Sequence, residues 1–244
     1  MIVPGPMSRL GPEARDRAGV DCGRVLLGDV DLSGHPVDIA PRILGARLVS
    51  TIGGTPVVAR IVEVEAYGGV GEDPGSHAFR RQTKRNATMF AGPGVAYVYF
   101  TYGMHWCLNL VVGPEGTAGA ILIRAARVIE GVDVARSRRP TARTDNDLCR
   151  GPARLTTALA ITGREDGSAM VAGLARVPVD ITLTAGEAAV EDIVRTPRTG
   201  VGGLGASLPW RFAVHGDAAV SPYRRAAARP SRTGDATSSG QIGP

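Results

Sequence analysis

Cysteine and histidine are scarce in this sequence. The 244 residues include three cysteines, at positions 22, 107 and 149. An odd number of widely spaced cysteines fits neither a disulfide framework nor a paired-cysteine metal motif. The four histidines are equally scattered, which argues against zinc, and an iron–sulfur cluster would need four thiolates. They are His35, His77, His105 and His215. We therefore expect reduced, structural cysteines and no metal or other cofactor.

Long hydrophobic runs are also missing. The apolar runs fall well short of the roughly 20 residues that a membrane helix needs. The first twenty residues contain charges and prolines without a continuous apolar stretch, so they do not read as an export signal. We expect no contact with a membrane and a cytoplasmic location.

Lysine is nearly absent, although the chain is basic. Arginine and lysine together number 28 against 23 acidic residues, and Lys84 is the only lysine. A net charge of +5 suits a polyanionic partner, because each neutralised phosphate releases counterions. The preference for arginine fits phosphate recognition and a GC-rich genome equally well.

The chain has the length of one large domain between two irregular ends. Residues 1–24 and 223–244 are rich in Gly, Pro, Ser, Arg and Ala, and we expect them to be disordered. Apolar and β-branched runs between turn residues predict strands. The predicted strands are 43–50, 57–67, 96–102, 106–112, 120–128, 177–183 and 210–214, with a helix at 147–161. Residues 25–222 therefore predict a single α+β domain around a curved, mostly antiparallel β-sheet with flanking helices.

The strand at 57–67 carries two carboxylates. Alternation along a strand places Glu63, Glu65 and Tyr67 on one face and residues 62, 64 and 66 on the other. Taken alone, this pattern fits a solvent-exposed polar face. It also fits a site in which a carboxylate and a phenol act together.

Two neighbouring segments favour a site. Residues 76–86 combine four basic side chains with His77 and Phe79, and such a mixture suits phosphates and stacked bases. Three of the five tyrosines lie within residues 97–102. Core packing does not explain Tyr102, which is next to the glycine of a predicted hairpin tip.

These motifs together resemble the alkyladenine (3-methyladenine) DNA glycosylase family, and the chain is identified as a bacterial member. The resemblance covers roughly residues 25–222. In chain order it comprises Arg60-Ile-Val-Glu-Val-Glu-Ala-Tyr67, His77, Arg81-Gln-Thr-Lys-Arg-Asn86, Met89-Phe90, Pro93-Gly94, Tyr97-Val-Tyr99, Tyr102-Gly-Met104, Asn109, Leu122-Ile-Arg124-Ala125, Glu130-Gly131, Leu148-Cys-Arg-Gly-Pro152 and Arg198-Thr-Gly-Val-Gly202.

The resemblance implies a role for each matching residue. Glu65 would be the general base, and Arg124 with the main-chain carbonyl of Thr199 would position the attacking water. The other implied contacts divide into two groups. The flipped base would be held by Tyr67, His77, Tyr99, Asn109 and Leu122. The DNA would be contacted by Tyr102 as a wedge, Met104, Arg81, Thr83, Lys84 and Arg85.

The resemblance also implies the reaction. The protein would flip alkylated or deaminated purines, of the 3-methyladenine, 7-methylguanine, hypoxanthine and ethenoadenine class, out of double-stranded DNA. It would hydrolyse the N-glycosidic bond and leave an abasic site without lyase activity. We expect it to act as a monomer associated with the nucleoid.

Two other interpretations use the same residues. A non-catalytic damaged-DNA-binding protein would need the basic and aromatic surface, but it would not need Glu65 and Arg124 together. A nucleoside hydrolase would use a glutamate in similar chemistry, but it would not need a tyrosine at a hairpin tip or an arginine cluster.

Overall fold

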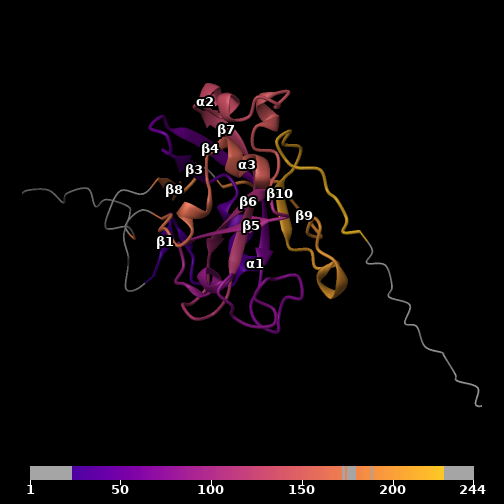
Figure 1. Cartoon of the computed structure of the whole chain (residues 1–244). Coiled ribbons are helices and arrows are strands. Elements are labelled where there is room, and N and C mark those ends of the chain that lie inside the picture. The colour runs from indigo at the N-terminus through magenta and orange to yellow at the C-terminus, as the bar shows by residue number, and fades with distance from the viewer. Residues whose placement is uncertain (1–23, 172–173, 175–179, 188, 228–244) are drawn as a thin grey trace, which may run out of the picture.

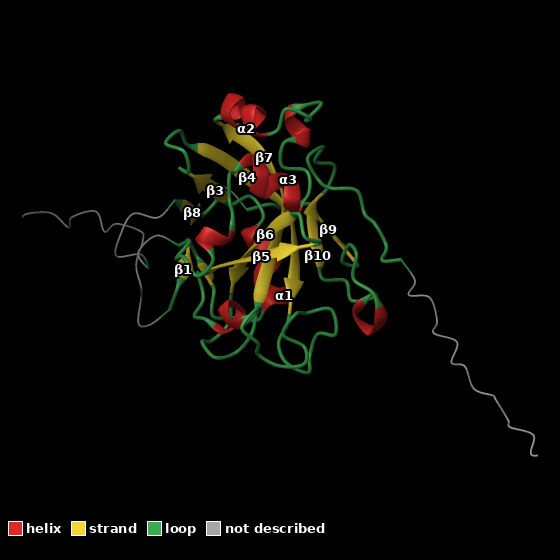
Figure 2. Ribbon diagram, in the orientation of Figure 1, coloured by secondary structure: helices red, strands yellow, loops and turns green. Residues whose placement is uncertain are grey.

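The structure is a computed structural model that describes residues 24–171, 174, 180–187 and 189–227. It forms one domain in which a curled β-sheet occupies the centre and short helices and long loops surround it (Figures 1 and 2). The segments predicted to be disordered fall mainly outside the described residues, at 1–23 and 228–244.

Eight strands form an antiparallel sheet in the order β5-β6-β7-β4-β10-β9, and β3 joins β4 to β8. The strands are β3 (Arg47–Ser50), β4 (Val57–Tyr67), β5 (Ala96–Thr101), β6 (His105–Val111), β7 (Ala120–Glu130), β8 (Ile181–Thr184), β9 (Ile193–Thr196) and β10 (Arg211–Val214). A separate two-stranded ribbon pairs β1 (Leu26–Leu27) with β2 (Val30–Asp31).

The helices are short and pack against the sheet, α3 on β6 and β7 and α1 on β4. The α-helices are α1 (Pro36–Ile39), α2 (Val132–Arg138) and α3 (Pro152–Ala158). Short 3-10 helices are η1 (Ala40–Ile43), η2 (Ala87–Phe90), η3 (Asp145–Asp147), η4 (Gly163–Glu165) and η5 (Gly203–Gly205). The predicted α+β class and the mostly antiparallel sheet are confirmed.

Several element boundaries differ from the prediction. The helix expected at 147–161 is α3 alone, because Gly151 has a φ of 122° and only Pro152 begins helical backbone. The strand expected from residue 43 begins at Arg47, after η1. Of the strand expected at 177–183, residues 177–179 lie outside the described part. The short strand β9 and helix α2 were not predicted.

Strands β4 and β7 each contain one extra residue at the same place. Ile61 pairs with Ala126 and Glu63 with Ala125, so Val62 is extra in β4. Glu63 pairs with Ala125 and Val64 with Ile123, so residue 124 is extra in β7. These two β-bulges compensate each other, and the register beyond them continues.

The paired bulges reverse the alternation of side chains. Ile61 and Val64 both enter the main core, although strict alternation puts them on opposite faces. Val62 instead packs with Ala125 and Ala219 in a separate small cluster. The prediction that Val62 shares the face of Val64 is therefore wrong, because Val62 is itself the extra residue of the bulge and regular alternation resumes only after it.

The turn after β7 gives a test of the packing at this end of the sheet. Gly131 has a φ of 72°, and a Cβ there would lie 2.3 Å from the carbonyl oxygen of Pro56. Gly116 has a φ of 84°, and a Cβ there would have no atom within 4 Å. We expect Gly116→Ala to cost about 1–2 kcal/mol through backbone strain, and Gly131→Ala to cost about 1–3 kcal/mol more through the clash. Urea denaturation would measure both, and equal losses would contradict the steric argument.

Candidate active site

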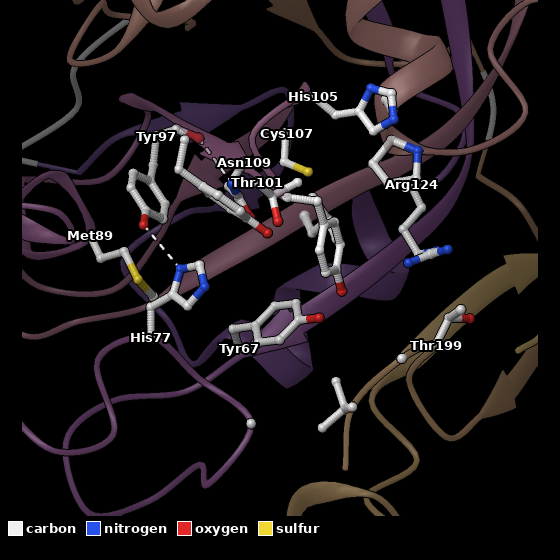
Figure 3. A pocket seen from close by; sticks show the side chains of 18 of the residues that line it. Tyr67, His77, Met89, Tyr97, Thr101, His105, Cys107, Asn109, Arg124 and Thr199 are labelled. Carbon is white, nitrogen blue, oxygen red and sulfur yellow. Dashed lines mark hydrogen bonds between the residues drawn. The ribbon is translucent and has the colours of Figure 1, made fainter. Parts of the chain in front are cut away.

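A cavity of about 420 Å³ opens on the face of the sheet opposite the main core. Its walls come from β4, β5, β6 and β7, from η2, from the start of α3, and from the loops at residues 74–77 and 199–202. Eight of the residues that the resemblance implied line it together: Tyr67, His77, Tyr99, Tyr102, Asn109, Leu122, Arg124 and Thr199. The volume lies within the range of small-ligand pockets, roughly 300–1,000 Å³. Figure 3 shows Arg124 and Thr199 to one side of Tyr67, and His77 and Met89 to the other.

Cross-strand pairing places these residues in one row. Tyr97 pairs with Asn109, Asn109 with Leu122, and Leu122 with Glu65. Arg211 on β10 is the next partner of Glu65. Residues far apart in the sequence thus form a line across the sheet, because directly opposed residues share a face.

Glu65 lies directly behind the cavity wall and is fully buried. Its Oε2 accepts hydrogen bonds from the Tyr67 hydroxyl at 2.9 Å and from Arg124 Nη1 at 3.4 Å. Its Oε1 accepts one from the main-chain N–H of Thr199 at 2.6 Å, the single hydrogen bond that this oxygen receives within the described part of the chain. Oε1 therefore keeps a lone pair for a further donor.

Glu63 is equally buried but is surrounded by donors. Its Oε1 accepts hydrogen bonds from Arg124 Nε at 2.9 Å, Arg211 Nε at 2.7 Å and Ser221 Oγ at 2.8 Å. Its Oε2 accepts one from the Ser221 N–H at 2.7 Å. The interpretation of this strand face as solvent-exposed is wrong for both carboxylates. Each has one oxygen with a single hydrogen bond, but that of Glu65 is bonded to Thr199, which lines the cavity, and that of Glu63 to Ser221, which does not.

Burial and the two carboxylates set the charge states here. Burial raises the pKa of Tyr67 well above its usual value, and the nearby Glu65 raises it further. The phenol therefore stays protonated as a donor. Burial alone would lower the pKa of Arg124, but Glu65 and Glu63 outweigh it and raise the pKa. Arg124 remains a cation beside Glu65.

A buried ion pair supports the Tyr67 ring from behind. The Arg198 guanidinium lies 4.6 Å from the ring centroid of Tyr67 and 5.1 Å from that of Trp210. Its Nη1 and Nη2 donate to the carboxylate of Asp73 at 2.5 and 2.6 Å, and both side chains are fully buried. Arg198 also donates to the carbonyl of Ala66 at 2.9 Å. The loop containing Asp73 and the loop containing Thr199 are thereby fastened to the end of β4.

The opposite wall is aromatic and neutral. The His77 ring meets the Tyr99 ring edge-on with centroids 4.6 Å apart, and its Nδ1 lies 3.2 Å from the Tyr97 hydroxyl. Burial raises the pKa of both tyrosines above the usual value. Burial and the nearby Arg85 lower the pKa of His77, so its imidazole is neutral at neutral pH. Asn109 is buried, and its Nδ2 donates to the Tyr97 carbonyl at 2.9 Å.

An exposed hairpin tip borders the cavity. Tyr102, between β5 and β6, is 85% exposed and has a φ of 51°, which is unusual for a residue other than glycine. Gly103 also has a positive φ, and Met104 N–H donates to the Thr101 carbonyl at 3.2 Å, which closes a tight turn. Met104 is exposed at the same tip and does not belong to the cavity lining.

The basic segment, residues 76–86, is ordered by one buried asparagine. Asn86 accepts from the main-chain N–H of Thr83 at 2.6 Å, and it donates to the carbonyls of His77 and Arg81. Arg85 donates to the Phe100 carbonyl at 3.3 Å, which joins the segment to the hairpin. The side chains that the resemblance assigned to DNA contact are all exposed: Arg81, Thr83, Lys84 and Arg85.

The described residues contain neither a cluster that could bind a metal ion nor a helix that could span a membrane. No group of three or more His, Cys, Asp and Glu side chains in this part of the chain could hold a metal ion. No helix among these residues is long and apolar enough to cross a membrane. Cys107 and Cys149 are buried and free, and Cys22 lies outside the described residues.

Comparison with known proteins identifies the family of this chain. The sequence profile of methylpurine-DNA glycosylase matches residues 31–218. The chain belongs to the methylpurine-DNA glycosylase family. It is 50% identical over 198 residues to a protein of Streptomyces avermitilis, covering 81% of this chain and 91% of that one. A Nocardia farcinica protein is 47% identical, covering 80% and 90%. Each relative is provisionally named 3-methyladenine DNA glycosylase.

Some residues of the site were missed by sequence reasoning. Tyr97, Met89 and Cys107 line the cavity of this methylpurine-DNA glycosylase family member, and the first two stand within motifs that had been quoted without a role. The contacts of Arg211 and Ser221 with Glu63 had no local signal. Thr199 does lie at the site, but the observed contact is from its amide N–H and not from its carbonyl.

The Asp73–Arg198 pair can be tested against an exposed pair of the same kind. Asp73→Asn leaves the buried Arg198 without a counter-charge, and we expect a loss of about 3–5 kcal/mol of unfolding free energy. Asp145→Asn breaks the half-exposed pair with Arg136, for which we expect about 0–1 kcal/mol. Urea denaturation of both variants checks this. Similar small losses would show that the buried pair does not hold the loops in place.

Proposed function

We propose that this protein removes alkylated or deaminated purines from double-stranded DNA as a monofunctional glycosylase. The observation that carries the proposal is the buried Glu65, which stands behind an aromatic cavity with one free lone pair on Oε1. Family membership and the names of its relatives support a role in repair of methylated purines. The broader lesion class, including hypoxanthine and ethenoadenine, is part of the proposal.

The proposed reaction is water attack on the anomeric carbon. Glu65 Oε1 accepts the proton of the water, the new C–O bond forms, and the electron pair of the C–N bond leaves with the purine. Positive charge develops on the sugar, and a nearby carboxylate stabilises it. Arg124 and the Thr199 segment hold Glu65 in place, and the Thr199 carbonyl would help to position the water.

The neutral aromatic walls suit a cationic purine. Alkylation at N3 or N7 makes the base positive, and aromatic faces attract cations by roughly 0.5–2 kcal/mol. Protonated phenols and a neutral His77 add no repulsive cation at that wall. In this proposal Tyr67, His77 and Tyr99 stack on the base and Leu122 packs against its edge. Asn109, fixed by its bond to the Tyr97 carbonyl, crowds the exocyclic amino group of normal guanine.

The exposed tip and the basic segment would bind the duplex. A base must leave the stack before hydrolysis, and an inserted side chain offsets part of the unstacking cost. Tyr102, at 85% exposure, is the proposed wedge, with Met104 beside it. Arg81, Thr83, Lys84 and Arg85 would contact phosphates. A protein that acts on free nucleosides has no use for these groups.

Replacement of Glu65 by Gln tests the base. We expect Glu65→Gln to keep binding of a lesion-containing duplex and to lose excision by about 10³-fold or more, because the amide cannot take the proton. Single-turnover excision from a panel of single-lesion oligonucleotides, followed by alkaline cleavage, measures this and reports the lesion class. Glu165→Gln is the control, since Glu165 is buried in η4 away from the cavity.

Two results would contradict the proposal. Excision by Glu65→Gln within tenfold of wild type would remove Glu65 from the chemistry. Normal binding of damaged duplex without any excision by the wild type would instead support the non-catalytic alternative.

The reaction should stop at the abasic site. A lyase needs an amine that forms a Schiff base, usually a lysine deprotonated by its surroundings. Lys84 is the only lysine, and it lies exposed on the basic segment. We expect borohydride present during turnover to trap no protein–DNA adduct, and strand breaks to appear only after alkali. An adduct that disappears in Lys84→Ala would overturn the water mechanism.

A further inference from the structure

Four buried charges lie together on the site face of the sheet. Glu63 and Glu65 come from β4, Arg124 from β7 and Arg211 from β10, and each side chain is at least about nine-tenths buried. Arg124 bridges the two carboxylates, with Nε on Glu63 and Nη1 on Glu65. The general base therefore shares its arginine with a second carboxylate that the proposed reaction does not use.

The chain after β10 completes this cluster. Ser221 Oγ donates to Glu63 Oε1 at 2.8 Å and accepts from Arg124 Nη2 at 3.3 Å, so it joins both groups. The Ser221 carbonyl accepts from Arg211 Nη2 at 3.0 Å. Two further arginines fix the preceding residues, with Arg150 on the Val220 carbonyl and Arg127 on Asp217. The family profile ends at residue 218, before Ser221.

The same segment reaches the loop that contains Thr199. The Gly200 N–H donates to the Arg224 carbonyl at 2.9 Å, one residue after the amide that binds Glu65. In Figure 1 the gold C-terminal part of the chain lies beside β9 and β10. Residues 217–224 thus touch the site at two places, through Ser221 and through Arg224.

We propose that Glu63, with Arg211 and Ser221, is a positioning residue that holds Arg124 against Glu65, and that residues 217–224 are thereby part of the active site. The inference rests on the proposed function. Glu63 accepts hydrogen bonds on both oxygens and binds Nε of Arg124. Only Nη1 of Arg124 therefore contacts Glu65. An unrestrained guanidinium would form a closer, two-point contact with Glu65 and make it a weaker base.

The charged and titratable groups around Glu65 determine the direction of the pH effect. Tyr67, Tyr99, Cys107, Arg124 and Arg211 lie around Glu65, Glu63 shares Arg124 with it, and the Asp73–Arg198 pair lies behind the Tyr67 ring. Glu63 and Asp73 are the other carboxylates among these groups, and Glu63 is the one that shares an arginine with Glu65. When Glu63 loses its negative charge, Arg124 can also move toward Glu65. Both changes stabilise the carboxylate form of Glu65, which then persists to lower pH.

The first test is Glu63→Gln, measured by single-turnover excision across a pH series. We expect the maximal rate to fall about 10- to 100-fold, as it does for residues that orient a reacting group from behind. We also expect the acid limb of the profile to move to lower pH. Affinity for a lesion duplex, compared in the Glu65→Gln background, should stay within about threefold. If the role of Glu63 were purely structural, Glu63→Gln would lower the folded fraction and leave the acid limb at the same pH.

The second test avoids the risk that Glu63→Gln fails to fold. Ser221→Ala keeps all four charges and removes one hydroxyl, and we expect excision to slow by about fivefold. Ser50→Ala is the matched control, because Ser50 is a buried serine whose hydroxyl donates to the Leu159 carbonyl at 2.7 Å away from the cavity. It should leave excision within about twofold of wild type after correction for the folded fraction.

The outcomes separate this inference from the proposed function. If wild type excises lesions and Glu65→Gln does not, but Glu63→Gln keeps the rate and the acid limb, the positioning role is overturned and the glycosylase remains. If Ser221→Ala slows excision no more than Ser50→Ala, the C-terminal segment is not part of the site. If wild type excises none of the lesions, the proposed function itself fails.

Discussion

The structure depends on the burial of charge on one face of β4. Glu63 and Glu65 are fully buried, and a buried charge is stable only when it is paired and hydrogen-bonded. The bulges in β4 and β7 meet this demand, because each adds one residue at the same level and brings Arg124 beside both carboxylates. Neither bulge alone would preserve the register beyond it. The pair lets the sheet keep its core on one face and its charged site on the other.

β4 is therefore both a structural centre and the strand that carries the proposed catalytic base. On one side it pairs with β7 along its length, and on the other it pairs with β3 and then with β10. Its core face contributes Ile61 and Val64, and its opposite face contributes Glu65. A reacting group on a central strand is held by packing and by hydrogen bonds from several elements, which fixes geometry better than a loop does. The cavity is then completed by loops that ion pairs such as Asp73–Arg198 fasten to the strand end.

The hairpin tip between β5 and β6 differs from the buried part of the site, because it is exposed and strained. Tyr102 stands at a turn with a φ of 51° and 85% of its surface in solvent, so both backbone and side chain are in states that folding does not favour. Strain of this kind persists where the surrounding structure enforces it, as the β5–β6 ladder does here. The buried Glu65 on β4 and the exposed aromatic tip between β5 and β6 therefore belong to one sheet, in which β7 lies between them. This arrangement is consistent with a protein that must enter a stacked duplex and then position a water.

The sequence alone determined most of the strands, the α+β class and part of the cavity lining, because alternation, turn residues and family motifs are local signals. It identified Glu65, Tyr67 and Arg124 by their motifs, but it left open whether the carboxylates faced water. Only the tertiary structure decided that, because burial depends on what covers a strand. The bulge that moves Val62 away from the face of Val64 exists only as a relation between two strands. The contacts of Arg211 and Ser221 with Glu63 span about 150 residues of sequence and leave no local pattern, since nothing but the folded sheet brings those side chains to the same carboxylate.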